Sequence, residues 1–196
     1  MFCVIDRSDS MSKCLNDTIQ GFNTFISRQP PDTPVTTFLF NNTVNELYRC
    51  QKASEVKPLN NVTYRPAGCT ALLDAIGRAI EVASNCTADT ITMVVLTDGE
   101  ENASSRYTKH QINKLIDDRK AQGWKFVFMG ANQDAIQVAD DLGIDQEGAL
   151  TFDTTCVRDA FRCLSDAVTR LQTGKTPRIE FSQLERQSSV IVNGPP

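Results

Sequence analysis

The sequence predicts a single α/β domain, with a doubly wound, mostly parallel sheet, one antiparallel edge strand and helices on both faces. Short apolar runs alternate with segments whose apolar residues recur every three or four positions, which is typical of strands that alternate with amphipathic helices. One run, TITMVVLT at 90–97, is almost continuously apolar, as expected for a central strand covered on both faces. A chain of 196 residues, 40% of them hydrophobic, is long enough to bury a sizeable core.

The first elements are a strand, a helix and a hairpin. FCVI at 2–5 predicts a short buried strand. The helix that follows carries apolar residues at steps of four, three and four, namely Leu15, Ile19, Phe22 and Ile26. VTTFLF at 35–40 and TVNELYRC at 43–50 flank the turn signal Asn41-Asn42, so we expect them to pair as a hairpin.

The middle of the chain continues the alternation. TALLDAIGRAIEVA at 70–83 predicts a helix with one apolar face. The central strand at 90–97 comes next, and Thr108 with Gln111 forms a capping box that opens a further helix.

The last elements complete the sheet. WKFVFMG at 124–130 and ALTF at 149–152 predict strands, and Asp134 caps a short helix between them. A final amphipathic helix carries five apolar residues on one face, namely Val157, Phe161, Leu164, Val168 and Leu171. Beyond Gly174 the chain is polar, so we expect residues 1–174 to form the domain and 175–196 a polar tail or edge segment.

Composition argues against several functions. The formal net charge is −4, which does not favour a nucleic-acid surface. No apolar run approaches the roughly 18 residues of a membrane helix, and the start lacks the basic leader and cleavage site of a signal peptide. Seven scattered cysteines without a CxxC pair, with one histidine, predict reduced thiols and no zinc site. We therefore expect a cytoplasmic protein that binds neither nucleic acid nor membrane.

Oxygen-bearing side chains follow the two strands at 2–5 and 90–97. Asp6, Ser8 and Ser10 come after the first, Asp98 comes after the second, and Thr70 lies where the helix at 70–83 opens. Ligands bind at the carboxyl ends of the strands in such sheets, so these segments should meet at one edge. Two carboxylates and three hydroxyls without imidazole or thiolate suit a hard cation, with Mg²⁺ favoured over Mn²⁺ or Ca²⁺.

These five residues carry a resemblance to a known family. DRSDS at 6–10, Thr70 in GCTALLDA and Asp98 in VVLTDGEEN resemble the metal-ion-dependent adhesion site (MIDAS) of von Willebrand factor A domains. The signature of that site is D-x-S-x-S, then a separate Thr and a separate Asp. The resemblance covers about residues 1–172, and GWKFVFMGANQDA with TDGEENAS looks most like compact stand-alone members from bacteria and phages.

The resemblance implies a role for each site residue. Ser8, Ser10 and Thr70 would reach the cation by their hydroxyls, and Asp6 and Asp98 would act largely through water. The cation would then seek one further anionic oxygen, which in the family is often an Asp or Glu side chain of a separate partner protein.

One position departs from the family pattern. Asp9 stands between the two serines, where the family usually has Gly, and Glu100 and Glu101 add further negative charge nearby. This acidic rim either raises cation affinity or repels an acidic ligand.

The main functional prediction is a divalent-metal-dependent protein-binding module without catalytic activity, because no nucleophile–base pair is present in the sequence pattern. The alternative is a Mg²⁺-dependent phosphoryl-transfer or hydrolytic enzyme, with Asp6 and Asp98 holding the metal and Asp9 or Glu100 as base. A third possibility is a domain that uses the metal only for stability.

Overall fold

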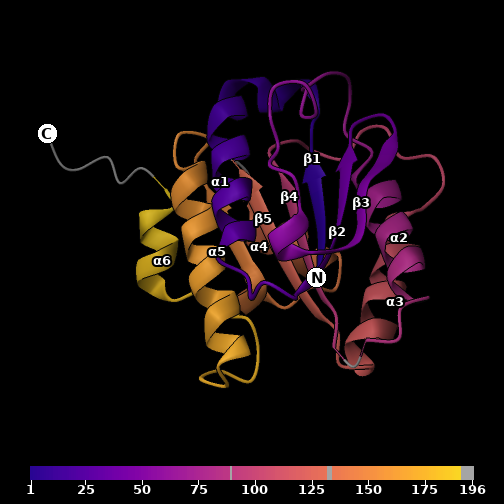
Figure 1. Ribbon diagram of the computed structural model, residues 1–196. Helices are drawn as coiled ribbons and strands as arrows, with labels where there is room; N and C mark the ends of the chain where they lie inside the picture. Colours follow the sequence, from indigo (N-terminus) through magenta and orange to yellow (C-terminus); the bar gives the residue numbers. More distant parts are fainter. Residues whose placement is uncertain (89, 132–133, 191–196) are drawn as a thin grey trace, which may run out of the picture.

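The computed structural model describes residues 1–88, 90–131 and 134–190 (Figure 1). Its six-stranded sheet consists of β1 (Phe2–Asp6), β2 (Pro34–Phe40), β3 (Val44–Lys52), β4 (Thr92–Thr97), β5 (Lys125–Ala131) and β6 (Ala149–Phe152). The strand order is β3-β2-β1-β4-β5-β6. Only the β2–β3 pair is antiparallel among the pairs of these strands. The predicted fold class, including the antiparallel edge strand, is confirmed.

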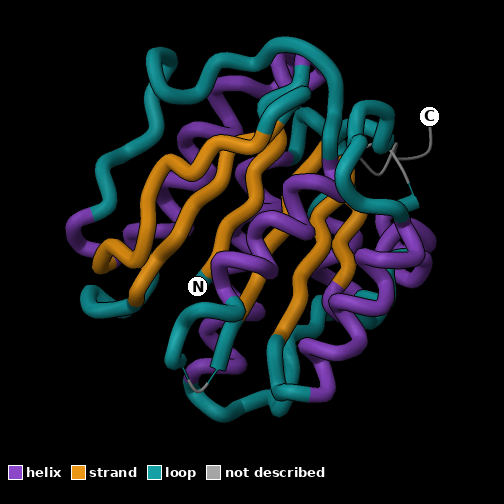
Figure 2. Tube along the Cα trace, turned by 90° about the vertical axis from the view of Figure 1, so that its right-hand side faces the viewer, coloured by secondary structure: helices purple, strands orange, loops and turns teal. Residues whose placement is uncertain are grey.

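Helices cover both faces of the sheet (Figure 2). The first face holds α1 (Leu15–Ser27) and α5 (Val157–Gln172), and the second holds α2 (Leu72–Ala83), α3 (Lys109–Ala121) and α4 (Ala135–Asp141). Alternate side chains of a strand point to opposite faces. Cys3 and Ile5 of β1 therefore join the first core, whereas Phe2 and Val4 join the second.

The two predicted helix caps agree with the structure. Thr108 and Gln111 form the capping box of α3, and the Asp134 carboxylate caps α4 by accepting from the Gln137 backbone N at 3.1 Å. The first helix, α1, begins at Leu15, the first residue of the expected apolar face, and a 3₁₀ helix that the sequence analysis did not predict, η1 (Asp9–Cys14), precedes it. The loop after β1 is therefore a tight helical turn.

The expected tail is folded over much of its length. Ile179 and Phe181 are buried in the first core, and the short helix α6 (Gln183–Ser188) follows them. Arg170 of α5 pairs with Glu185 at 2.8 Å. A second ion pair joins Arg178 to Glu147 at 3.5 Å, and the Phe181 backbone N donates to the Glu147 backbone oxygen at 3.0 Å. Residues 175–190 therefore pack on the domain as an edge segment. Residues 191–196 lie outside the described residues.

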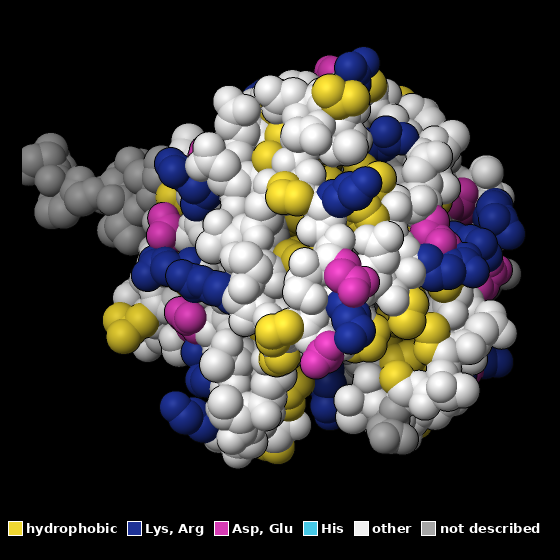
Figure 3. All heavy atoms as spheres, viewed as in Figure 1, with side chains coloured by type: hydrophobic (Ala, Val, Ile, Leu, Met, Phe, Trp, Pro, Cys, Tyr) yellow, Lys and Arg dark blue, Asp and Glu magenta, His cyan; other side chains and the backbone are white. Residues whose placement is uncertain are grey.

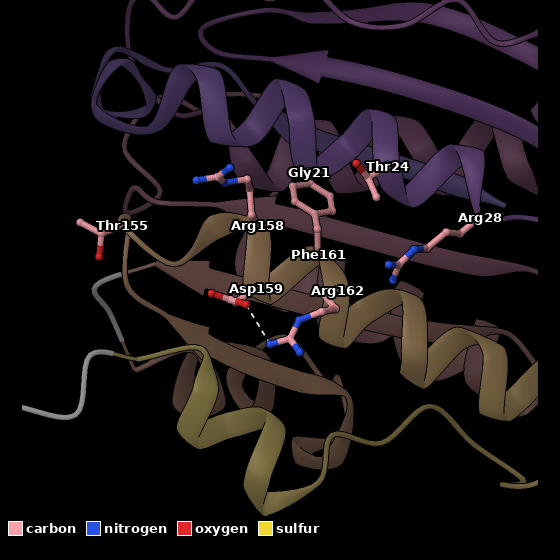
Figure 4. A pocket seen from close by; sticks show the side chains of 8 residues that line it. All are labelled: Gly21, Thr24, Arg28, Thr155, Arg158, Asp159, Phe161 and Arg162. Atoms are coloured by element: carbon pink, nitrogen blue, oxygen red, sulfur yellow. Dashed lines mark hydrogen bonds and ion pairs between the residues drawn. The ribbon is translucent and has the colours of Figure 1, made fainter.

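The helices α1 and α5 approach closely at Gly21, where a Cβ would lie 2.3 Å from Cδ2 of Phe161 (Figure 4). A cavity of about 370 Å³ lies beside this contact, with Arg158 and Arg162 among its lining residues. Arg158 pairs with an aspartate of α1, and Arg162 pairs with one of its own helix. The lining of this cavity includes none of the five predicted site residues.

Charged side chains of both signs are mixed on the face shown in Figure 3. Within the described residues, no helix combines the length and apolar character needed to cross a membrane.

Candidate metal centre

The candidate site lies where the path of the chain across the sheet reverses. From β1 the chain passes outward to β2 and β3 on one side, and from β4 it passes outward to β5 and β6 on the other. β1 and β4 are neighbours, with Ile5 opposite Leu96. Their carboxyl ends therefore lie together, near the upper end of the sheet in Figure 1. Doubly wound sheets bind ligands in the crevice at this position.

Asp6 ends β1 and is buried, with both carboxylate oxygens hydrogen-bonded. Its Oδ1 accepts from the Ser8 backbone N at 2.6 Å, and its Oδ2 accepts from the Thr97 hydroxyl at 2.6 Å. Burial raises the pKa of Asp6 to about 6, these hydrogen bonds oppose the rise, and the charge of Asp98 adds to it. Negative charge is costly at this point, so a nearby cation would stabilise it.

The two serines connect Asp6 to Asp98. The Ser8 and Ser10 hydroxyl oxygens lie 3.1 Å apart, and the Ser10 hydroxyl donates to Oδ1 of Asp98 at 2.5 Å. Burial raises the pKa of Asp98, and the hydrogen bond from Ser10 opposes this rise. The structure therefore brings four of the five predicted residues into one hydrogen-bonded group.

Thr70 completes the group from the loop before α2. A Cβ built on Gly99 would lie 2.8 Å from Oγ1 of Thr70, 3.5 Å from Oγ of Ser10 and 3.7 Å from Oγ of Ser8. The three hydroxyls thus surround a small space that the missing side chain of Gly99 leaves open. Thr70 is buried, and its backbone N donates to Oδ1 of Asn102 at 2.9 Å.

This donor set fits a hard divalent cation. Hydroxyl and carboxylate oxygens are the ligands that Mg²⁺, Mn²⁺ and Ca²⁺ take in proteins. Residues 1–88, 90–131 and 134–190 contain no group of three His, Cys, Asp or Glu side chains able to hold a metal. Hydroxyls would therefore supply most of the donors, and the three hydroxyl oxygens close to the open space beside Gly99 are the atoms that a cation would contact.

Three residues that the sequence analysis missed hold the site in place. Thr97 donates to Asp6, the buried Tyr64 donates its phenolic hydrogen to the Asp6 backbone oxygen at 2.5 Å, and Asn102 accepts from the Thr70 backbone N at 2.9 Å. Thr97 gave a weak signal as the polar last residue of an apolar run. The contacts of Tyr64 and Asn102 join residues far apart in the chain, and no sequence pattern marked them.

The sequence analysis counted Glu101 in the acidic rim, but in the structure backbone N–H groups bind its carboxylate. Its carboxylate accepts from the backbone N of Leu73 at 2.9 Å, of Ala103 at 3.0 Å and of Ser104 at 2.7 Å. Glu101 thus ties the loop after β4 to the first turn of α2. Asp9 and Glu100 are exposed, as a charged rim requires. Asp9 opens η1 without the positive φ that would favour glycine.

The strand order and the oxygen-bearing side chains at the ends of β1 and β4 place this chain in the class of doubly wound α/β domains that carry a polar site where the strand order reverses. Residues 1–155 match the model of the von Willebrand factor type A domain. The chain belongs to this family. No curated protein sequence matches the chain significantly.

Solved structures share the fold at low identity. The von Willebrand factor domain of the type V pili tip protein Mfa5 from Porphyromonas gingivalis is 12% identical, with a TM-score of 0.66 over 86% of this chain and 94% of that one. Proximal thread matrix protein 1 from the mussel byssus is 14% identical, with a TM-score of 0.64 over 84% of this chain and 44% of that one. The chain therefore spans less than half of the mussel protein.

A second structure of the mussel protein has a zinc-occupied MIDAS motif. It is 16% identical, with a TM-score of 0.61 over 86% of this chain and 47% of that one. At this low sequence identity, the similarity shows a shared fold only.

Proposed function

We propose that this domain binds one divalent cation, with Mg²⁺ as the first choice, and uses it to hold a carboxylate of a separate partner protein. The observation that carries the proposal is the group of three hydroxyls around the open space at Gly99, flanked by Asp6 and Asp98. In this account Ser8, Ser10 and Thr70 hold the cation directly.

The carboxylates have a supporting role in this proposal. Asp6 accepts from the Ser8 backbone N and the Thr97 hydroxyl, so it positions the loop that carries Ser8. Asp98 accepts from the Ser10 hydroxyl and orients that donor directly. Neutral donors leave most of the positive charge of the cation uncompensated. The cation would therefore attract an anionic oxygen from outside the domain.

The enzyme alternative has weaker support. Asp9 and Glu100, its candidate bases, are exposed at the rim, and Glu101 is occupied by three backbone N–H groups. His110 is exposed on α3. Glu101 also accepts from the Ser104 hydroxyl at 2.7 Å, which occupies it further. In the described residues no second side chain orients Asp9, Glu100 or His110 by a hydrogen bond, which a general base usually requires. We therefore favour binding over catalysis.

Fluorescence anisotropy with labelled hexapeptides tests the proposal. Each peptide holds one Asp among neutral residues, and its counterpart holds Asn instead. We expect the Asp peptides to bind in Mg²⁺, and to lose binding with chelator, with Asn, or in Ser8→Ala/Ser10→Ala. Ser12→Ala is the matched control, because Ser12 is exposed on the same 3₁₀ helix.

Two results would contradict the proposal. One is peptide binding that chelator does not affect. The other is Mg²⁺-dependent hydrolysis of a generic phosphate ester that Asp6→Ala abolishes, which would favour the enzyme instead.

A further inference from the structure

An apolar cavity adjoins the candidate metal centre. It has a volume of about 200 Å³, and four aliphatic side chains line it, from Leu72, Leu73, Val138 and Leu142. The first two belong to the start of α2 and the others to α4 and its end. Gly99 also lines the cavity, and a Cβ at Gly99 would lie 2.8 Å from the hydroxyl oxygen of Thr70, 3.5 Å from that of Ser10 and 3.7 Å from that of Ser8. The cavity and the metal centre are therefore immediate neighbours.

The rim of the cavity is fixed and charged. Lys109 of α3 pairs with Asp141 of α4 at 2.5 Å, and both lie on the cavity wall. Glu101 is held by the backbone N–H groups of its own loop and of α2. Glu100 is exposed beside them. The negative charges of Glu100 and Glu101 would repel a second carboxylate at this rim. The aliphatic side chains below it would instead pack against an apolar group.

The size of the cavity suits one large aliphatic or aromatic side chain. An aliphatic cavity of about 150 Å³ is known to hold a benzene molecule. A cavity of about 200 Å³ in this structure can therefore take the side chain of Leu or Phe.

We infer that the partner protein presents a two-part motif, with one carboxylate for the cation and a neighbouring large apolar side chain for this cavity. The inference rests on the proposed function and adds the second half of the recognition element. It also explains how an acidic rim is compatible with an acidic ligand. A single carboxylate is attracted by the cation, while Asp9 and Glu100 exclude segments with further acids.

The test uses the labelled single-Asp hexapeptides in Mg²⁺, with Leu or Ser placed one, two or three residues to either side of Asp. At the best spacing, we expect the Leu peptide to bind at least about tenfold more tightly than the Ser peptide, because the Leu side chain is buried. Leu73→Gln should remove this difference and leave the Mg²⁺ affinity and the Ser-peptide affinity unchanged.

Leu184→Gln is the matched control, because Leu184 is 77% exposed on α6. It should leave the preference for Leu intact, and thermal melts check that both variants fold. Equal affinity for Leu and Ser peptides at every spacing, or a preference that survives Leu73→Gln, would overturn this inference alone. Failure of every Asp peptide to bind a protein that still binds Mg²⁺ would overturn the proposed function and this inference together.

Discussion

Gly99 is the residue whose missing side chain keeps the candidate centre open. Its φ lies outside the left-handed region, so alanine fits its backbone. A Cβ there would lie 2.8 Å from Oγ1 of Thr70 and would face Ser10 and Ser8. We predict that Gly99→Ala weakens Mg²⁺ binding at least about tenfold, equal to about 1.4 kcal/mol, with little change in thermal stability. Calorimetric titration measures this, and an unchanged affinity would place the cation elsewhere.

Thr97 supplies one of the two hydrogen bonds that hold the Asp6 carboxylate. Thr97→Val keeps the shape and leaves a buried carboxylate oxygen without its donor, so we predict a loss of about 1–3 kcal/mol in unfolding free energy. Thr37→Val is the matched control, because the Thr37 hydroxyl is buried in β2 without a hydrogen-bond partner in the described structure. It should be neutral or stabilising. Urea unfolding in chelator compares the two, and equal losses would contradict this role of Thr97.

The loop after β4 acts as one element because Glu101 binds it to α2. Three backbone N–H groups, from Leu73, Ala103 and Ser104, donate to its carboxylate. Glu101→Gln removes the charge and one acceptor oxygen at a helix N-terminus, so we predict a loss of about 1–2 kcal/mol in unfolding free energy.

The neighbouring Glu100 provides the control for this prediction. It is exposed, so Glu100→Gln should change the unfolding free energy by less than about 0.5 kcal/mol. Equal effects of the two substitutions in urea unfolding would show that Glu101 does not anchor the loop.

At the same scale, the sequence predicted the elements well because their signals are local. Apolar periodicity lies within the residues of each element, and the capping box of Thr108 involves only residues at the start of its helix. The D-x-S-x-S motif and Asp98 could be located at the edge of the sheet because they stand at the ends of strands that the pattern already indicated. Tyr64 and Asn102 were missed because their partners, Asp6 and Thr70, are distant in sequence. The sequence analysis placed Glu101 on the acidic rim, because the charge of a residue does not reveal which backbone N–H groups donate to it.

At the scale of the whole molecule, the segment beyond Gly174 completes the first core. The sequence analysis expected a polar tail or edge segment, because Ile179 and Phe181 are too few to form a recognisable apolar pattern. Both are buried against the domain. We predict that Phe181→Ala lowers the unfolding free energy by about 3 kcal/mol, since it empties a buried site. Leu184→Ala, on the exposed side of the same segment, should cost less than about 0.5 kcal/mol.

Urea unfolding compares these two variants as well. A Phe181→Ala variant as stable as Leu184→Ala would mean that residues 175–190 do not pack on the domain in solution.

The central claim is that the strand ends hold a cation through hydroxyls. Its most direct test is calorimetric titration of Mg²⁺, Mn²⁺ and Ca²⁺ into chelator-treated wild type, Ser8→Ala/Ser10→Ala and Ser12→Ala. The account predicts saturable one-site binding of Mg²⁺ to wild type and Ser12→Ala, and its loss in the double variant, with all three proteins folded. Binding that survives in Ser8→Ala/Ser10→Ala, or no binding to folded wild type, would contradict it.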